Sequence, residues 1–332
     1  MSQVLLPSFE EIFSMESLLK SWQVFKKGKK SKVDVAEFSS NFIYNLTDLH
    51  RDLMAGYYRH GGYAYFKISD PKSRNIHKAS VRDRIVHHAL YRALYPYFDS
   101  QFIHDSYSCR IDKGTHRALY QFQSFGRKVS YNNTRTAWVL KCDIRKCFAS
   151  VDQAILRVLL KKNISCVKTL VILDLIINSF SSGIPGKGIP LGNLTSQLFI
   201  NIYLHELDYV LKYYFKIDCY IRYADDFVIF SEEKAQLEEL LPKLGDFVQE
   251  DLFLELHPDK IFIQTLASGV DFLGWVHFPN HRVLRTTTKR RMFRRITECK
   301  NNEATLRSYR GLLSHGNARK LQVVVDKLAS LY

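Results

Sequence analysis

The sequence predicts an α+β fold whose strands form one mostly antiparallel sheet. Short apolar runs with β-branched residues alternate with longer segments whose apolar residues recur at helical spacing. Two of the short runs, Cys219–Tyr223 and Phe227–Phe230, are joined through Ala224-Asp225-Asp226, which predicts a β-hairpin. Hydrophobic residues make up 46% of the 332 residues, so the chain can bury one large core or the cores of two to three subdomains.

The first part of the chain is expected to be helical and to lead into one strand. Leu18, Leu19, Trp22 and Phe25 lie at helical spacing, and a lysine-rich connection follows them. The elements expected next are a helix over Phe38–Leu53, a break at Gly61-Gly62, a strand over Tyr63–Ile68, a turn at Asp70-Pro71, and a helix over Arg82–Tyr95 that ends near Pro96.

The second part is expected to supply the remaining strands. Ala137–Ile144 is short and apolar and suits a buried strand that ends at Asp143. Ser150 and Gln153 have the spacing of a capping box, which predicts that the next helix begins there. The later elements are a Gly- and Pro-rich loop over Gly183–Gly192, a helix through Leu194, Leu198 and Ile202, a helix over Glu232–Glu250, and strands over Lys260–Gln264 and Phe272–His277.

The positive charge of the chain indicates which kinds of partner it can bind. A net charge of +15 and a pI near 9.4 attract nucleic acid or an anionic membrane. The longest apolar run, Leu170–Ile177, contains Asp174 and is too short to span a membrane, and the N-terminus lacks a secretory signal. The six cysteines form no Cys-x-x-Cys pair, which argues against zinc and against disulfides. We therefore expect a cytoplasmic protein that binds nucleic acid and not a membrane.

Much of the positive charge lies in the C-terminal segment. Residues 280–332 contain 13 Lys and Arg residues and three acidic residues. Apolar residues such as Met292, Phe293 and Ile296 interleave with them, so a folded basic subdomain is favoured over a solvated face. A second cluster comprises Lys26, Lys27, Lys29, Lys30 and Lys32, for which a solvated face or a flexible loop is an equally good interpretation.

Three carboxylates are candidates for catalysis. Asp225-Asp226 lies between two apolar strands, and Asp143 ends another. Adjacent carboxylates repel each other and gain nothing from burial, whereas Mg²⁺ binds carboxylate oxygens together with substrate phosphates. If these strands are neighbours in one sheet, the three carboxylates converge and can hold two metal ions for an in-line phosphoryl transfer. The alternative is that Asp225-Asp226 is only a polar hairpin turn.

These residues resemble the catalytic motifs of reverse transcriptases. Tyr223-Ala224-Asp225-Asp226 matches their tyrosine-x-aspartate-aspartate box, and Asp143 falls in a segment that looks like their first catalytic motif. The resemblance implies a right-hand polymerase with fingers, an antiparallel-sheet palm and a helical thumb. It also implies two Mg²⁺ ions, which Mn²⁺ could replace, held by Asp143, Asp225, Asp226 and the backbone carbonyl of Ile144.

Further resemblance assigns residues to the incoming deoxynucleoside triphosphate. Phe148 stands five residues beyond Asp143, where the family has an aromatic gate that excludes a ribose 2′-hydroxyl, although a core Phe is the alternative. Lys67 and Arg74 resemble the fingers residues that bind the triphosphate, with surface salt bridges as the alternative. Lys260, in His257-Pro258-Asp259-Lys260, resembles the lysine that protonates departing pyrophosphate.

The remaining resemblance concerns the nucleic acid. Phe272-Leu273-Gly274-Trp275 is similar to the primer grip, which implies that Gly274 and Trp275 contact the primer, and an ordinary β-turn with core aromatics is the alternative. The expected organisation is a helical basic segment over residues 1–60, interleaved fingers and palm over 61–280, and a basic helical thumb over 281–332. The thumb is expected to bind the template–primer backbone through Arg290, Arg291, Arg294 and Arg295.

One loop resembles a particular subgroup of the family. Most reverse transcriptases have Gln-Gly where this chain has Leu191-Gly192, and Ser-Pro where it has Ser196-Gln197. The resemblance implies that Leu191 and Gly192 contact the incoming nucleotide, where a Gln could form a hydrogen bond and Leu offers only apolar contact. Both departures look like the reverse transcriptases of diversity-generating retroelements. That resemblance implies cDNA with errors opposite template adenines, a template RNA, and a small, basic, ring-forming accessory protein. The alternatives are a retron, intron-derived or abortive-infection reverse transcriptase, and, from another class, a catalytically inactive RNA-binding module.

Overall fold

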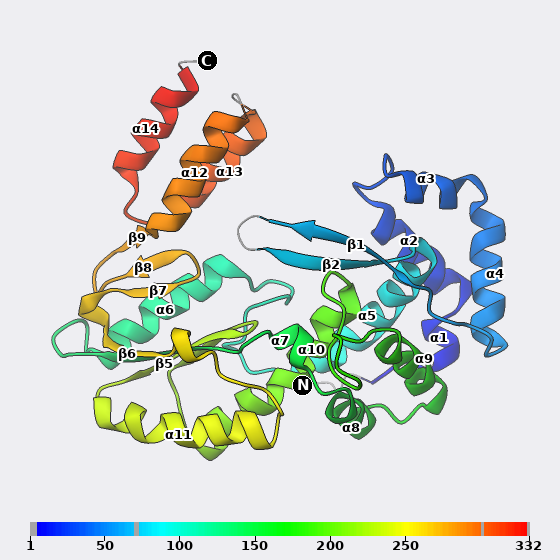
Figure 1. The fold of residues 1–332 in the computed structure, drawn as a ribbon, viewed down its shortest axis with the longest axis horizontal. Helices are drawn as coiled ribbons and strands as arrows, with labels where there is room; N and C mark the ends of the chain where they lie inside the picture. The colour runs from blue at the N-terminus through cyan, green and yellow to red at the C-terminus, as the bar shows by residue number, and fades with distance from the viewer. Residues whose placement is uncertain (1–4, 70–72, 300–301, 331–332) are drawn as a thin grey trace. The chain divides into compact units, whose positions relative to one another are not determined.

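The structure, a computed structural model, describes residues 5–69, 73–299 and 302–330 (Figure 1). The chain divides into two compact units. The first unit comprises Met1–His104, Ile144–Tyr214 and Asp246–Glu255, and the second comprises Asp105–Asp143, Phe215–Gly245 and Leu256–Tyr332. The turn predicted at Asp70-Pro71 lies outside the described residues. In the part of the chain that is described, no helix is both long enough and apolar enough to cross a membrane.

The first unit is mainly helical. Its central helix, α5 (Val81–Gln101), begins where the Ser80 side chain accepts a hydrogen bond from the backbone of Asp83, and it contacts both α2 and α10. The hydroxyl of Thr195 on α10 lies 2.6 Å from the buried ring of His87 on α5. The other helices are α1 (Phe9–Ile12), α2 (Met15–Lys26), α3 (Val33–Ser40), α4 (Phe42–Met54), α7 (Cys147–Ser150), α8 (Gln153–Asn163), α9 (Val167–Asn178) and α10 (Leu194–Tyr209), which continues as a π-helical turn over Val210–Tyr214.

A two-stranded ribbon completes the first unit. Strands β1 (Tyr63–Ile68) and β2 (Arg74–Ala79) pair antiparallel, and the side chains of β1 are mostly exposed. The base of the ribbon is fixed to the end of α9, because the hydroxyl of Tyr63 lies 2.7 Å from that of Ser179. The exposed part of the ribbon therefore extends from a fixed base.

The second unit is built on a four-stranded antiparallel sheet in the order β4-β5-β3-β6. One face packs against α6 (Thr115–Val129), where Phe122 and Phe125 join Val139, Val228 and Phe230 in one buried cluster. The strands are β3 (Trp138–Asp143), β4 (Tyr220–Tyr223), β5 (Asp226–Ser231) and β6 (Phe262–Thr265), and α11 (Lys234–Glu250) follows β5.

A smaller sheet and three helices form the C-terminal part of the second unit. The sheet contains β7 (Val270–Phe272), β8 (Trp275–His277) and β9 (Arg282–Leu284), and the helices are α12 (Thr286–Glu298), α13 (Glu303–Leu313) and α14 (Arg319–Ser330). The helices lie side by side, α12 against α13 and α13 against α14 (Figure 1). Trp275, Met292 and Leu313 belong to the buried cluster that joins sheet and helices.

The α+β class and the antiparallel pairing are confirmed, but the strands of the described residues form three sheets and not one. The segment Phe272–His277, expected to be one strand, is a hairpin, because Leu273 and Gly274 adopt positive φ angles of 51° and 84° and reverse the chain. The segment Phe38–Leu53 is divided between α3 and α4 at Asn41, whose ψ of 37° is not helical. Short apolar runs predicted most of the strands but not β2 or β9, and they did not show which strands pair.

Two predicted helix boundaries are wrong. Helix α5 does not end near Pro96 but continues to Gln101, because Leu94 and Phe98 on either side of the proline are buried and their packing outweighs the lost backbone hydrogen bond. Ser150 and Gln153 do not form a capping box. Asp152 caps α8 instead, and the buried Gln153 amide donates to the carbonyls of Phe180 and Gly188.

Candidate active site

The hairpin β4–β5 places Asp225 and Asp226 at one end of the four-stranded sheet. Tyr223 pairs with Asp226, so Ala224 and Asp225 form the two-residue connection. Ala224 has a φ of +55°, a backbone conformation that costs an alanine about 1 kcal/mol. Such strain persists only where the surroundings hold the backbone in place, and it is found preferentially at functional sites.

A buried arginine braces this hairpin. Arg222 is fully buried in β4, and its guanidinium donates to the Ala224 carbonyl at 3.3 Å and to the Ser106 hydroxyl at 3.1 Å. The backbone of Arg222 also pairs with Asp105 and Tyr107. Arg222 was not predicted from the sequence, although an arginine within the apolar run Tyr220–Tyr223 is a signal that could have identified it.

Asp143 lies on β3, the strand next to the β4–β5 hairpin in the sheet. It is the last residue of β3, and its register partner on β5 is Asp226, so both side chains leave the same face. The ammonium of Lys260 donates to Asp143 Oδ1 at 2.6 Å, and the backbone N–H of His257 donates to the Asp143 carbonyl at 2.7 Å. The turn that carries Lys260 is thereby fixed to the end of β3. Strand pairing brings Asp143, Asp225, Asp226 and Lys260 into one region of the second unit.

The surroundings of Asp226 disfavour its negative charge. Its Oδ1 atom is buried and has no hydrogen-bond partner among the described residues, although it forms an ion pair with the ammonium of Lys141 at 3.6 Å. Burial is the largest cause that raises the pKa of Asp226, to about 7, and the charges of Asp143 and Asp225 raise it further while Lys141 opposes them. Lys141, which sequence analysis also missed, donates to the Asp271 carbonyl at 2.6 Å.

Carboxylate oxygens such as those of Asp143, Asp225 and Asp226 are suitable ligands for a divalent cation such as Mg²⁺. A cation beside Asp226 Oδ1, which accepts no hydrogen bond from the described residues, would offset the repulsion that raises the pKa of Asp226. Within the described residues, however, no group of three or more His, Cys, Asp or Glu side chains is assembled so as to hold a metal ion. The ammonium of Lys260 partly neutralises Asp143 in this arrangement. The sequence-based prediction of two metal ions therefore stays a prediction.

The residues predicted to bind the triphosphate lie in the first unit. Lys67 and Arg74 are exposed near the tip of the β1–β2 ribbon. Lys67 pairs with Asn75 and Arg74 with Ile68, so the two cations occupy adjacent positions and leave opposite faces of the ribbon.

One loop connects the other predicted substrate residues. The backbone N–H of Ile189 donates to the carbonyl of Phe148 on α7 at 2.8 Å, and two residues later the Leu191 carbonyl accepts from the N–H of His77 on β2 at 2.9 Å. Gly192 has a φ of +111°, and a Cβ there would lie 2.6 Å from Ile76 Cγ2. Phe148 and Leu191 are partly exposed, whereas the side chain of Ile144 is buried.

The structure corrects the role predicted for Trp275. Its side chain is fully buried in the cluster that joins β8 to the C-terminal helices, so its ring cannot contact a primer. The ring lies so close to Gly316 that a Cβ there would be 2.1 Å from Trp275 Cζ3. Trp275 therefore anchors the C-terminal helices, and Gly274 occupies the β7–β8 turn as expected of an ordinary β-turn with core aromatics.

The basic residues of α12 lie opposite its buried face or beside it. Met292 and Ile296 point into the core, while Arg290 and Arg294 are exposed and Arg291 and Arg295 are partly exposed. Glu298 lies 3.7 Å from Arg294 and 3.9 Å from Arg295, so the charge of these two arginines is partly offset. This arrangement is compatible with a phosphate-binding helix and equally with a solvated face.

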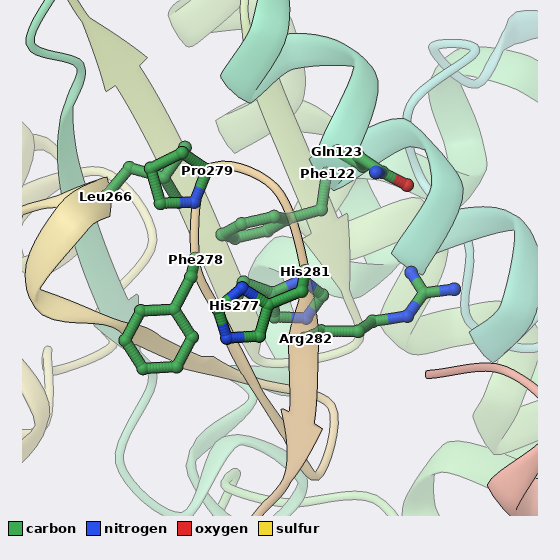
Figure 2. Close-up of a pocket in the computed structure, with 8 residues that line it drawn as sticks. All are labelled: Phe122, Gln123, Leu266, His277, Phe278, Pro279, His281 and Arg282. Carbon is green, nitrogen blue, oxygen red and sulfur yellow. The ribbon is translucent and has the colours of Figure 1, made fainter. Parts of the chain in front are cut away.

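Neither of two cavities contains a predicted site residue. A cavity of about 20 Å³ beside β8 is lined by Phe122, His277 and Arg282, among others (Figure 2). It has room for one water-sized molecule and not for a nucleotide. His277 is neutral there, because burial lowers its pKa to about 3. In the first unit, an open groove of about 550 Å³ is lined by residues of α3 and β2, including Asp34, Glu37 and Lys78.

The chain is similar in sequence to one protein family and to several known proteins. The family described as "Reverse transcriptase (RNA-dependent DNA polymerase)" matches residues 67–277, well over half of the chain. Protein YkfC of Escherichia coli (strain K12) is 25% identical, over 77% of this chain and 76% of that protein. The group II intron-encoded protein LtrA of Lactococcus lactis subsp. cremoris is 23% identical, over 63% of this chain, and the chain spans less than half (45%) of LtrA.

A solved structure shows a similar fold. A telomerase from Candida albicans, in complex with a fragment of telomeric RNA, matches with a TM-score of 0.50 at 11% sequence identity, over 72% of this chain and 50% of that one. At this identity the likeness concerns the fold alone. Together with the antiparallel sheets, it supports the right-hand architecture expected from the sequence.

Proposed function

Because the chain belongs to the reverse transcriptase family and is an RNA-directed DNA polymerase, we propose that it copies a retroelement template RNA into error-prone cDNA for targeted gene diversification. The observation that carries the polymerase chemistry is the register that sets Asp143 opposite Asp226, next to Asp225. The observation that carries the subgroup is the loop with Leu191-Gly192 and Ser196-Gln197.

The apolar side chain of Leu191 is the physical basis for low fidelity in this proposal. A Gln at this position could hydrogen-bond to the incoming nucleotide, whereas Leu offers only apolar contact. The loss of a hydrogen bond that tests geometry reduces the free-energy difference between correct and incorrect nucleotides.

We propose that Asp143, Asp225, Asp226 and the carbonyl of Ile144 hold two Mg²⁺ ions. The bound ions would supply Lewis-acid stabilisation of the charge that develops on the phosphates and on the attacking and leaving oxygens. Lys141 limits the repulsion within this group, because its positive charge lowers the pKa of Asp226, which the charges of Asp143 and Asp225 raise. Lys260 would donate a proton to the departing pyrophosphate, a role suited to an ammonium held beside Asp143.

The proposed partners follow from the charge and the family. Lys67, Arg74 and Phe148 would bind and select the deoxynucleoside triphosphate, and the basic residues of α12 would bind the backbone of template RNA and cDNA. A small, basic accessory protein would complete the assembly. The proposed organisation is a helical basic segment over residues 1–60, fingers and palm over 61–280 and a thumb over 281–332, in a cytoplasmic protein.

The similarity to LtrA favours one alternative, a reverse transcriptase derived from a group II intron. A catalytically inactive RNA-binding module is disfavoured, because the group of Asp143, Asp225 and Asp226 would weaken RNA binding by repelling phosphates and would have no use in such a module. The two active classes differ in the errors that they leave in cDNA. Errors concentrated opposite template adenines support the proposal, and rare errors spread evenly over the four bases support the intron-derived alternative.

The test of the chemistry is primer extension on an RNA template with Mg²⁺. Asp225→Asn should reduce extension by at least about a thousandfold, because one charge that would hold the metal ions is lost, while RNA binding stays near the wild-type level. Asp251→Asn, at an exposed aspartate in the first unit, is the matched control and should retain activity. Comparable extension by the Asp225 variant and the wild type would reject the proposed carboxylate site.

A further inference from the structure

The outer edge of β2 is covered by the loop that carries Leu191. One edge of β2 pairs with β1, and on the other the N–H of His77 donates to the Leu191 carbonyl at 2.9 Å. Close contact of the two backbones depends on Gly192, because its φ is +111° and a Cβ at that position would lie 2.6 Å from Ile76 Cγ2 on β2. The loop thus acts as a short additional partner of the ribbon.

Asn193 makes this contact with its side chain. Its amide nitrogen donates to the His77 carbonyl at 2.8 Å and lies 3.4 Å from the Pro190 carbonyl, and its Oδ1 accepts from the N–H of Ala79 at 3.3 Å. The residue is 2% exposed, so water cannot replace these partners. Leaving buried backbone groups without partners is costly, so the Asn193 amide is a strong determinant of how the ribbon sits on the loop.

The other end of the same loop is fixed to the region of Phe148. The N–H of Gly188 donates to the Val151 carbonyl and that of Ile189 to the Phe148 carbonyl, both at 2.8 Å. Within six residues, the chain therefore joins the predicted sugar gate, the predicted fidelity residue Leu191 and the ribbon that carries Lys67 and Arg74. These groups are predicted to contact the sugar, the base and the phosphates of one nucleotide.

We propose that Asn193 is a positioning residue that locks the β1–β2 ribbon to the loop of Leu191, so that the phosphate-binding cations and the fidelity residue act on the nucleotide as one rigid element. The inference rests on the proposed function, because it takes the nucleotide as the shared ligand. Asn193 itself is buried and contacts protein groups, so it acts through the ribbon and the loop. Small displacements of positioning groups reduce rates steeply.

Two variants separate the hydrogen-bonding role of Asn193 from its volume. Asn193→Ala removes the donor and the acceptor. Asn193→Asp keeps the volume and the acceptor for Ala79 but places a carboxylate oxygen against the His77 carbonyl. Asn163→Ala is the matched control, because the Asn163 amide donates to the Leu159 carbonyl within α8, accepts from the Tyr97 hydroxyl, and forms no hydrogen bond with the ribbon or the loop among the described residues.

The measurements are the KM for deoxynucleotides, kcat, the cDNA error spectrum and hydrogen exchange. Both Asn193 variants should raise KM by roughly fivefold to a hundredfold, the range for buried hydrogen-bonding groups left unpartnered, with a smaller change in kcat and altered errors opposite adenine. Backbone amides of residues 74–79 should exchange at least about tenfold faster. Asn163→Ala should leave all four unchanged, whatever its effect on thermal stability.

The outcomes distinguish this inference from the proposed function. If both Asn193 variants keep the wild-type KM, error spectrum and exchange rates, the lock does not exist. If Asn193→Asp behaves like the wild type, volume alone matters and the hydrogen-bonding role is rejected. If the wild-type protein fails to extend a primer, the proposed function is rejected, while hydrogen exchange still decides whether Asn193 holds the ribbon. If Asn193→Ala does not fold, the isosteric Asp variant provides the same test.

Discussion

Replacing Asp226 with Asn should stabilise the metal-free protein at alkaline pH. The folded state raises the pKa of Asp226 from its ordinary value of 3.8 to about 7, chiefly through burial. Asn has nearly the same shape and carries no charge. In the wild type, the stability associated with the protonated carboxyl is fully present below about pH 4 and is lost as the pH rises through about 7. The Asp226→Asn variant has no carboxyl to ionise at this position, so its free energy of unfolding does not fall in this way.

The magnitude follows from the same pKa. Each pKa unit corresponds to about 1.4 kcal/mol, so ionised Asp226 costs the folded state at most about 4 kcal/mol above pH 7. Between pH 5 and pH 8 the difference in unfolding free energy between Asp226→Asn and the wild type should grow by roughly 2–3 kcal/mol. The ammonium of Lys141 keeps this cost from being larger, because it already opposes the increase in pKa.

Urea unfolding in EDTA at pH 5, 6.5 and 8, followed by circular dichroism, measures this difference. Asp251→Asn, which changes an exposed carboxylate, should track the wild type at every pH. Millimolar MgCl₂ should reduce the advantage of Asp226→Asn at pH 8, because a cation that binds the folded wild type stabilises it. A difference that does not change with pH, or a variant that is less stable than the wild type at pH 8, would contradict the assigned electrostatics.

Three further predictions concern substrate and nucleic acid. Phe148→Ala should increase ribonucleotide incorporation by roughly tenfold or more by removing a clash, and unchanged sugar selectivity in a folded variant would return Phe148 to the core. Leu191→Gln should lower misincorporation opposite adenine about threefold to tenfold, the value of one net hydrogen bond, and an identical error spectrum would place the source of errors elsewhere. Alanine at Arg290, Arg291, Arg294 and Arg295 should flatten the salt dependence of RNA binding by up to about one unit per lost phosphate contact; an unchanged slope would make α12 a solvated face.

Local chemistry made much of the fold class and of the carboxylate group predictable. Asp143 and Asp225-Asp226 follow or interrupt apolar strands, and polar residues at strand ends are visible in one sequence. Lys141 and Arg222 were not predicted, because their importance depends on which strand and segment lie beside them. Lys141 is placed near Asp226 by the pairing of β3 with β5, and Arg222 is placed against Ser106 by a segment more than a hundred residues away.

The errors in the prediction have a common cause. The helix end near Pro96 and the single helix over Phe38–Leu53 were predicted from local patterns, whereas the folded chain continues the first helix past Pro96 and divides the second at Asn41. Trp275 was placed at the nucleic acid because its motif resembles the primer grip, but burial decides what a side chain can touch. Asn193 gave no signal of its own, since its role depends on an edge of β2 that only the folded chain reveals.

The alternation of the chain between its two units has a consequence for folding. Neither unit is a continuous stretch of sequence, so the chain cannot be cut once to yield two fragments that fold independently. Strand β3 pairs with β6 (Phe262–Thr265), which is synthesised only after α7 to α11, and pairing between such distant segments forms slowly. Before β6 has been synthesised and has paired, the edge of β3 that contains Val139 and Leu140 is open and can pair with other chains. The strand that ends at Asp143 is therefore open to pairing with other chains during synthesis.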